Sequence, residues 1–357
     1  MESPVLFSTS ADGSVGIATL NRPKQLNALT LEMCELMGKQ FGEWANDDSV
    51  KCVLLNANGE KGFCAGGDVA EVIRNVRAGG PDRYAYGDAF FATEYALNLM
   101  MHTYSKPLVV LSHGICMGGG VGLLAGASHG VLVAGSKIAM PEIHIGLFPD
   151  VGGGYFLQDF FDGRDKLMAL TGCIINEGDA IEGYLASFAI PQSAHAGFID
   201  AIAQIEWGDS REENDELISA CIEAMDDGTV PLEGPFATFA EETKKLDRCE
   251  TVIEFRDALN ELARREPYFA AAAKNLSQGS PTAAHVTFEY LKRCRPLEID
   301  QVLALDLILA KQFQRHHDFS EGVRALLIDK DKTPKWSPED WNAIDPALIE
   351  AHFAPLA

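Results

Sequence analysis

The chain has 357 residues, enough to bury a substantial core in one large domain or two modest ones. Hydrophobic residues make up 47% and charged residues 23%, as in an ordinary globular protein. The formal net charge of −23 argues against nucleic acid and anionic membrane surfaces as partners, because little could neutralise a run of phosphates. A small anionic ligand is compatible with this charge if a few local Arg or Lys residues offset the acidic field.

The eight cysteines are scattered without CxxC pairs or neighbouring histidines, a pattern that favours buried, reduced thiols over a disulfide framework or a zinc site. The first residues show no basic region followed by an apolar stretch, and no run reaches the roughly 18 apolar residues of a membrane helix. We therefore expect no metal, no membrane contact and a cytoplasmic location.

Short apolar runs rich in β-branched residues predict strands at 15–20, 53–56, 108–112 and 130–134. Helical patterns lie between them at 30–44, 82–103 and 120–127. Two stretches share one layout of strand, glycine-rich loop and helix: VLLNANGEKGFCAGGDVAEVI and LVVLSHGICMGGGVGLLAG. This repetition predicts an α/β fold.

Strand signals fade after about residue 190, and residues 196–276 predict helices with acidic, solvated faces. A Gly-Ser-Pro break at 279–281 precedes a helix at 282–294 and a further apolar-periodic helix that ends near Phe313. We predict a core over residues 1–195 and a mainly helical C-terminal region over 196–357, packed on that core.

The two glycine-rich loops, CAGGD at 64–68 and GGGVG at 118–122, each precede a predicted helix. Helix N-termini leave backbone N–H groups without partners, and glycine lets such a backbone approach a ligand closely. Two loops of matching layout could aim one N–H group each at a single oxygen, which is an oxyanion hole. The alternative is that these glycines only permit close packing of helix on strand.

The segment MPEIHIGLFPDVGGG at 140–154 places Glu142 and Asp150 eight residues apart among apolar residues, Pro and Gly. A carboxylate is costly to bury there unless it has partners or a function. Together with the two loops, the pair indicates acyl chemistry on an activated carbonyl. The alternatives are that Glu142 is a helix N-cap or a surface carboxylate after Pro141, and that Asp150 is a turn residue after Pro149.

Two familiar motifs do not fit their structural context. Residues 120–125 match the loose dinucleotide pattern GxGxxA, but the strand ends too far upstream for the tight turn of a Rossmann unit. Residues 126–130 match GxSxG around Ser128, but a helix precedes and a strand follows, the reverse of a nucleophile elbow.

The sequence resembles the crotonase (enoyl-CoA hydratase/isomerase) superfamily in LNRPKQLNAL at 20–29, GFCAGGD at 62–68, HGICMGGGVG at 113–122 and the 140–154 segment. Within it, FPDVGGG, EYALN at 94–98 and DFSEGVRALLIDKDKTPKW at 318–336 are most similar to the 3-hydroxyisobutyryl-CoA hydrolase branch. The likeness runs from about residue 5 to about residue 340. It implies a crotonase-like spiral of ββα units with a helical C-terminal region.

The resemblance also implies the roles of individual residues. The N–H groups of Gly67 and Gly119 would form the oxyanion hole, Glu142 and Asp150 would be the catalytic carboxyls, and Glu94 would hold a substrate hydroxyl. From the residues alone, Glu94 could equally be exposed helix surface. His144 has no role in the family and is expected to be structural.

The reaction implied is hydrolysis of 3-hydroxyisobutyryl-CoA, with 3-hydroxypropionyl-CoA as a second substrate, in valine breakdown. Hydratases of the superfamily carry a second catalytic glutamate two residues after the GGG triplet, where this chain has Gly122. Glycine cannot act as an acid or a base, which favours hydrolysis over hydration. A hydratase or isomerase of an unsaturated acyl-CoA remains the alternative.

Binding of the CoA moiety requires cations, and Arg22 and Lys24 lie in the segment that runs along CoA in similar proteins. Arg324, Lys330 and Lys332 are further candidates. We expect no cofactor, since CoA is part of the substrate. The expected partner is a small acyl-CoA molecule, and superfamily members often form trimers or hexamers.

Overall fold

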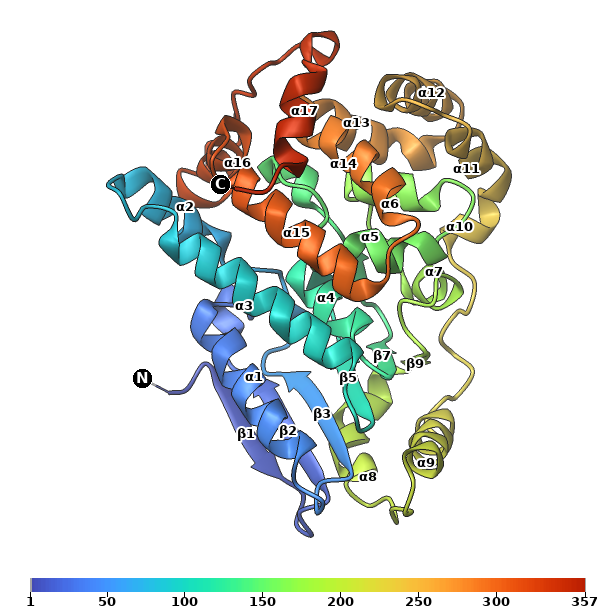
Figure 1. Ribbon diagram of the computed structural model, residues 1–357. Helices are drawn as coiled ribbons and strands as arrows, with labels where there is room; N and C mark the ends of the chain where they lie inside the picture. Colours follow the sequence, from blue (N-terminus) through green and yellow to red (C-terminus); the bar gives the residue numbers. More distant parts are fainter. Residues whose placement is uncertain (1, 357) are drawn as a thin grey trace. The chain divides into compact units, whose positions relative to one another are not determined.

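The computed structural model describes residues 2–356 (Figure 1). By their contacts these residues divide into two compact units. Unit 1 comprises residues 2–67, Ala96–Ile138 and Ile175–Pro235, and unit 2 comprises Asp68–Tyr95, Ala139–Ile174 and residues 236–356. Three elements cross between the units: α3 (Ala85–His102), β8 (Lys137–Ala139) and α10 (Pro235–Thr238). Each unit is defined by the contacts among its residues and combines three segments of the chain. The predicted division at residue 195 cuts the chain once instead, and it stays a prediction.

Unit 1 contains the main sheet, in which β1 pairs antiparallel with β2 and every further neighbour is parallel, in the order β1-β2-β3-β5-β7-β9. Its elements are β1 (Val5–Thr9), β2 (Val15–Leu20), η1 (Pro23–Gln25), α1 (Leu31–Ala45), β3 (Cys52–Ala57), β4 (Gly62–Cys64), β5 (Leu108–Ser112), β6 (Ile115–Met117), α4 (Gly119–Ala125), β7 (His129–Val133), α7 (Glu177–Glu182), β9 (Phe188–Ile190), η4 (Gln192–Gly197), α8 (Phe198–Ile202) and α9 (Arg211–Glu223).

A second, three-stranded sheet has the order β4-β6-β8. Successive strand pairs, β3 with β4, β5 with β6 and β7 with β8, therefore contribute one strand to each sheet. A helix follows the first two pairs, so the chain winds as repeated ββα units. This arrangement confirms the predicted mixed α/β class and its spiral of ββα units.

Helix α1 covers part of the main sheet, and its sequence explains both its start and its packing (Figure 1). The Thr30 side chain accepts a bond from the Met33 N–H group and so caps the helix N-terminus. Trp44 packs edge-on against Phe7 of β1 at 5.8 Å. A side chain at Gly16 of β2 would lie only 2.6 Å from the Trp44 ring, which explains the glycine there.

The core on the main sheet is made by alternate residues of the parallel strands and by α8 and α9. Its fully buried members come from β2, β3, β5, β7, β9, α8 and α9: Val15, Cys52, Leu54, Val109, Leu111, Val131, Val133, Ile190, Phe198, Ile202, Ile218 and Ile222.

Unit 2 is helical apart from the end of β8, and every element after β9 in the described chain is a helix. Its elements are α2 (Val69–Ala78), η2 (Glu142–Ile145), α5 (Gly153–Phe156), η3 (Leu157–Asp159), α6 (Arg164–Thr171), α11 (Ala240–Asp247), α12 (Val252–Arg265), η5 (Pro267–Phe269), α13 (Ala270–Gln278), α14 (Pro281–Cys294), α15 (Ile299–Phe313), α16 (His317–Val323), the π-helical turn η6 (Arg324–Ile328), η7 (Trp341–Ala343) and α17 (Pro346–Phe353).

Candidate active site

The two glycine-rich loops lie against each other in unit 1. Strand β4 pairs in parallel with β6, which aligns Cys64 with Cys116 and brings the loops that follow them together. A Cβ atom on Gly66, at φ +102°, would lie 3.5 Å from the Gly119 nitrogen. A Cβ atom on Gly120 would lie 2.5 Å from the Cys64 carbonyl oxygen, so only glycine lets α4 begin this close to β4.

The backbone N–H groups of Gly67 and Gly119 are available for a ligand. Gly119 is the first residue of α4, where an N–H group has no partner within the helix. The bridge between Leu29 and Gly67 bonds through the Leu29 N–H and the Gly66 oxygen, which leaves the Gly67 N–H unused. Within residues 2–356, neither amide donates a hydrogen bond. Two unused donors on adjoining loops are what an oxyanion hole requires.

The three carboxyl groups that the sequence predicts for the site are all buried in unit 2: Glu94 on α3, Glu142 at the start of η2, and Asp150 in the loop between η2 and α5. Their exposed fractions are 3%, 5% and 6%. The alternatives of exposed surface for Glu94 and Glu142 are therefore excluded. Glu94 Oε1 and Glu142 Oε2 are buried without a hydrogen-bond partner among the described residues, a costly state unless a ligand supplies one.

The three groups perturb one another's ionisation. Burial raises the pKa of Glu94 and of Glu142 well above the ordinary value, and the charge of Asp150 raises both further. Burial also raises the pKa of Asp150, to about 6, against the opposing hydrogen bond from Tyr95. Interacting carboxyls of this kind titrate as a coupled set, and the raised pKa values favour the protonated forms of Glu94 and Glu142. One ionised and one protonated carboxyl in the same place can act as base and acid.

Tyr95 was not singled out in the sequence, yet its hydroxyl donates a 2.6 Å hydrogen bond to Asp150 Oδ2. Asp306 on α15 and Tyr290 on α14 were also missed. Asp306 Oδ2 accepts a 2.8 Å bond from the N–H group of Gly152, two residues after Asp150. A signal for Asp306 was available: it is a lone acid in the apolar run VLALDLILA, where a charge has to have partners.

The cations that the sequence predicts to contact CoA are not members of the carboxyl cluster. Arg22 precedes η1 in unit 1, and its guanidinium donates to the Ala28 carbonyl oxygen, whereas Lys24 is exposed within η1. In unit 2, Arg324 binds three carboxylates, those of Glu321, Asp329 and Asp331. Its charge is therefore already matched by acids. Contact of Arg22 and Lys24 with CoA stays a prediction.

Gly122 is buried inside α4, so no carboxylate projects from that position. Ser128 of the GxSxG match follows α4 and precedes β7, and its hydroxyl bonds to both backbone groups of Leu108 and to His129. Ser128 therefore has a structural role, because its hydrogen bonds connect the start of β7 to the neighbouring strand β5. No group of three His, Cys, Asp or Glu side chains within residues 2–356 is arranged to hold a metal ion. No helix in that part of the chain is both long and apolar enough to span a bilayer.

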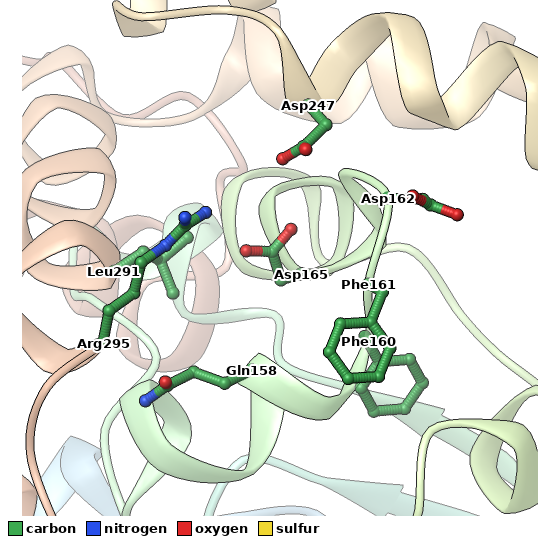
Figure 2. Close-up of a pocket in the computed structure, with 8 residues that line it drawn as sticks. All are labelled: Gln158, Phe160, Phe161, Asp162, Asp165, Asp247, Leu291 and Arg295. Atoms are coloured by element: carbon green, nitrogen blue, oxygen red, sulfur yellow. The ribbon is translucent and has the colours of Figure 1, made fainter.

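Unit 2 also contains a cavity of about 410 Å³ (Figure 2). Burial raises the pKa of its Asp165 to about 6. None of the predicted site residues lines this cavity, so it is not the candidate active site. Its lining residues are Gln158, Phe160, Phe161, Asp162, Asp165, Asp247, Leu291 and Arg295.

Comparison with known proteins identifies the family. A family model described as enoyl-CoA hydratase/isomerase matches residues 15–353. The mitochondrial 3-hydroxyisobutyryl-CoA hydrolase of Danio rerio is 33% identical over 99% of this chain and 90% of its own length. The protein of the same name from Xenopus tropicalis is 35% identical over 96% of this chain and 87% of its own. A solved structure described as an enoyl-CoA hydratase from Rhodobacter sphaeroides 2.4.1 matches with 34% identity and a TM-score of 0.87, over 99% of this chain and 98% of that one.

These matches cover nearly the whole chain and confirm the resemblance found in its motifs. The fold of repeated ββα units agrees with them. The chain therefore belongs to the enoyl-CoA hydratase/isomerase family, the crotonase superfamily.

Proposed function

We propose that the chain hydrolyses the thioester of 3-hydroxyisobutyryl-CoA to the free hydroxy acid and CoA, a step of valine breakdown. Relatives of that name are about a third identical over nearly its whole length. The observation that carries the proposal is the cluster of three buried carboxyls, Glu94, Glu142 and Asp150, with shared titration. The glycine at position 122 supports it further, because water addition to a double bond would lack its second acid–base group.

The thioester carbonyl needs donors that stabilise negative charge on its oxygen as the tetrahedral intermediate forms. The unused N–H groups of Gly67 and Gly119 would supply them. Each donor of this kind typically lowers the activation barrier by about 2.7–4 kcal/mol. The carboxyl cluster would supply the nucleophile or the base. The ionised member acts on the carbonyl or on water, and a protonated member gives its proton to the departing thiolate.

Two routes satisfy this chemistry. In the first, the Glu142 carboxylate attacks the carbonyl carbon, the C–S bond breaks, and water then cleaves the mixed anhydride. In the second, Glu142 takes a proton from water, whose oxygen attacks the carbonyl directly. Both consume one water and release CoA thiol and the hydroxy acid. Single-turnover hydrolysis in ¹⁸O-labelled water would separate them, because the first route leaves ¹⁸O in the carboxyl of Glu142 when water attacks that side of the anhydride.

Glu94 would read the hydroxyl of the substrate. Its Oε1 atom has no partner among the described residues, so a substrate hydroxyl would satisfy a buried acceptor that is otherwise unpaired. A site of this kind discriminates strongly against an acyl group that lacks the hydroxyl.

The test is release of free thiol from 3-hydroxyisobutyryl-CoA, with acetyl-CoA and crotonyl-CoA in parallel. Wild-type protein should release thiol rapidly from the hydroxyacyl substrate only. Glu142→Ala and Asp150→Asn should fold and lose most of the activity. Glu339→Gln, an exposed carboxyl in the same unit, is the matched control and should retain it. Wild-type rates from both cluster variants would exclude the proposed roles.

A hydratase or isomerase is the second candidate, favoured by the solved relative described as an enoyl-CoA hydratase. Its signature would be loss of the crotonyl-CoA double bond without free thiol. That result would mean that the carboxyl cluster performs water addition without a carboxylate at position 122.

A further inference from the structure

Asp306 is a fully buried carboxyl whose hydrogen bonds end on the turn that carries Asp150. It lies on α15 with no exposed surface. Its Oδ2 atom accepts a 2.8 Å bond from the Gly152 N–H, and its Oδ1 atom accepts a 2.6 Å bond from the Tyr290 hydroxyl. The Tyr290 oxygen in turn accepts a 2.8 Å bond from the Gly154 N–H. Two backbone donors of one turn are thus tied to two side chains from distant helices.

The turn needs such support because its backbone is in an unfavourable conformation. Val151, directly after Asp150, has a φ of +53°, a region that β-branched residues rarely enter. Gly152 follows at φ +86°, and the Gly153 N–H bonds back to the Asp150 carbonyl oxygen at 2.8 Å. A strained backbone persists only where its surroundings determine it, and such strain gathers at functional sites.

Tyr290 is held firmly enough to act as a support. Its ring packs edge-on against Phe148 at 5.1 Å, and Phe148 stacks on Phe313 at 5.5 Å. A Cβ atom on Gly154 would lie 2.6 Å from Tyr290, so the glycine is what allows the hydroxyl to reach the backbone.

We propose that Asp306, together with Tyr290, is a positioning residue that fixes the Asp150–Gly154 turn so that the Asp150 carboxyl keeps its hydrogen bond from Tyr95. This inference rests on the proposed hydrolase function. Asp306 does not touch the substrate. It acts through Asp150, whose chemistry requires the carboxyl to be held in one orientation.

The first experiment compares three variants of the full-length chain. Asp306→Ala removes both acceptors and should lower kcat by about a hundredfold with KM nearly unchanged. Asp306→Asn should rescue most of kcat, because its oxygen accepts from Gly152 and its amide donates to Tyr290. Leu259→Ala leaves a cavity at the buried face of α12 and lowers the stability of the fold. It is the matched control for an effect of stability alone, and it should keep the wild-type kcat. Wild-type kcat in Asp306→Ala would overturn the inference.

The second experiment asks whether Asp306 acts through Asp150. In an Asp150→Asn background, adding Asp306→Ala should cost little further in kcat, because the group being positioned is already disabled. Equal fold losses in both backgrounds would show a general structural effect and refute positioning. Tyr290→Phe, which removes the acceptor of the Gly154 N–H, gives the same test if Asp306→Ala does not fold.

Amide hydrogen exchange provides a readout that does not depend on activity. The Gly152 and Gly154 amides should exchange slowly in wild type and in Asp306→Asn, and quickly in Asp306→Ala. Absence of thiol release by wild type would reject the proposed function alone, whereas unchanged exchange in Asp306→Ala would reject the support of the turn.

Discussion

Replacing Tyr95 with Phe removes one hydroxyl and tests how the carboxyl cluster is tuned. That hydroxyl donates a 2.6 Å bond to Asp150 Oδ2, and it opposes the rise in pKa that burial causes. Tyr95 is 3% exposed, so the phenylalanine ring fits the same space. The substitution therefore removes the bond and little else.

The size of the effect follows from the energy of a hydrogen bond to a charged group, about 1.5–3 kcal/mol. At about 1.4 kcal/mol per pKa unit, its loss should raise the pKa of Asp150 from about 6 by roughly one to two units. Since the proposed mechanism needs the cluster to lose a proton, the acidic limb of kcat/KM should move upward by the same amount. Activity should fall most near pH 6 and recover above about pH 8.

The assay is thiol release measured with 4,4′-dithiodipyridine, which reports thiols in acid as well as at neutral pH. Stability gives an independent check. Asp150 has a folded pKa above its unfolded value of 3.8, so its contribution to folding is most favourable below that value and is lost as the pH rises through the folded pKa. Relative to wild type, Tyr95→Phe should therefore destabilise the protein increasingly from about pH 6, the folded pKa of Asp150 in wild type, to about pH 8. An acidic limb that stays in place, or moves downward, would refute the reasoning.

Gly120→Ala should displace α4 and the Gly119 amide, because its Cβ atom would lie 2.5 Å from the Cys64 oxygen. Thiol release should fall by about a hundredfold or more, whereas Gly38→Ala, with no atom within 4 Å of the new Cβ, should match wild type; equal rates in both would contradict the oxyanion role. Asp165→Asn should stabilise the chain by up to about 3 kcal/mol near neutral pH and by little near pH 4, because burial raises the Asp165 pKa to about 6 and ionisation therefore opposes folding. Urea unfolding at the two pH values measures this, and a loss of stability near neutral pH would count against it. Glu94→Gln should reduce the preference for 3-hydroxyisobutyryl-CoA over isobutyryl-CoA by about tenfold, measured as the ratio of kcat/KM, and an unchanged ratio would remove its role in reading the hydroxyl.

Local patterns in the sequence predict the main strands and helices well. The expected strands at 15–20 and 108–112 coincide with β2 and β5, and the helix expected at 30–44 is α1, which starts one residue after its cap Thr30. Each has a clear run of β-branched residues or a helical period with a capping signal. Strands β4, β6 and β8 have three residues each, too short for such a period, and were not predicted.

The candidate site shows the same limit at a larger scale. The sequence indicates Glu142 and Asp150 because charged groups stand out in an apolar, turn-rich segment. It does not indicate which helices supply the hydrogen bonds to Asp150 and to the turn that follows it. Tyr95 and Tyr290 look like ordinary core aromatics, and their hydroxyl partners are 55 and 16 residues away in the chain. Only the tertiary fold creates those bonds.

The division of unit 2 into three chain segments has a consequence for biosynthesis. Glu94 belongs to its first segment, Glu142 and Asp150 to the second, and Asp306 to the third. As the chain emerges from the ribosome, the first three acids are made before the helix that bonds the turn beside Asp150 exists. A nascent chain that stops before α15 therefore leaves the Gly152 N–H and the Tyr290 hydroxyl without their carboxylate. Catalytic competence should appear late and abruptly during synthesis, a pattern that ribosome-stalled chains of increasing length would reveal.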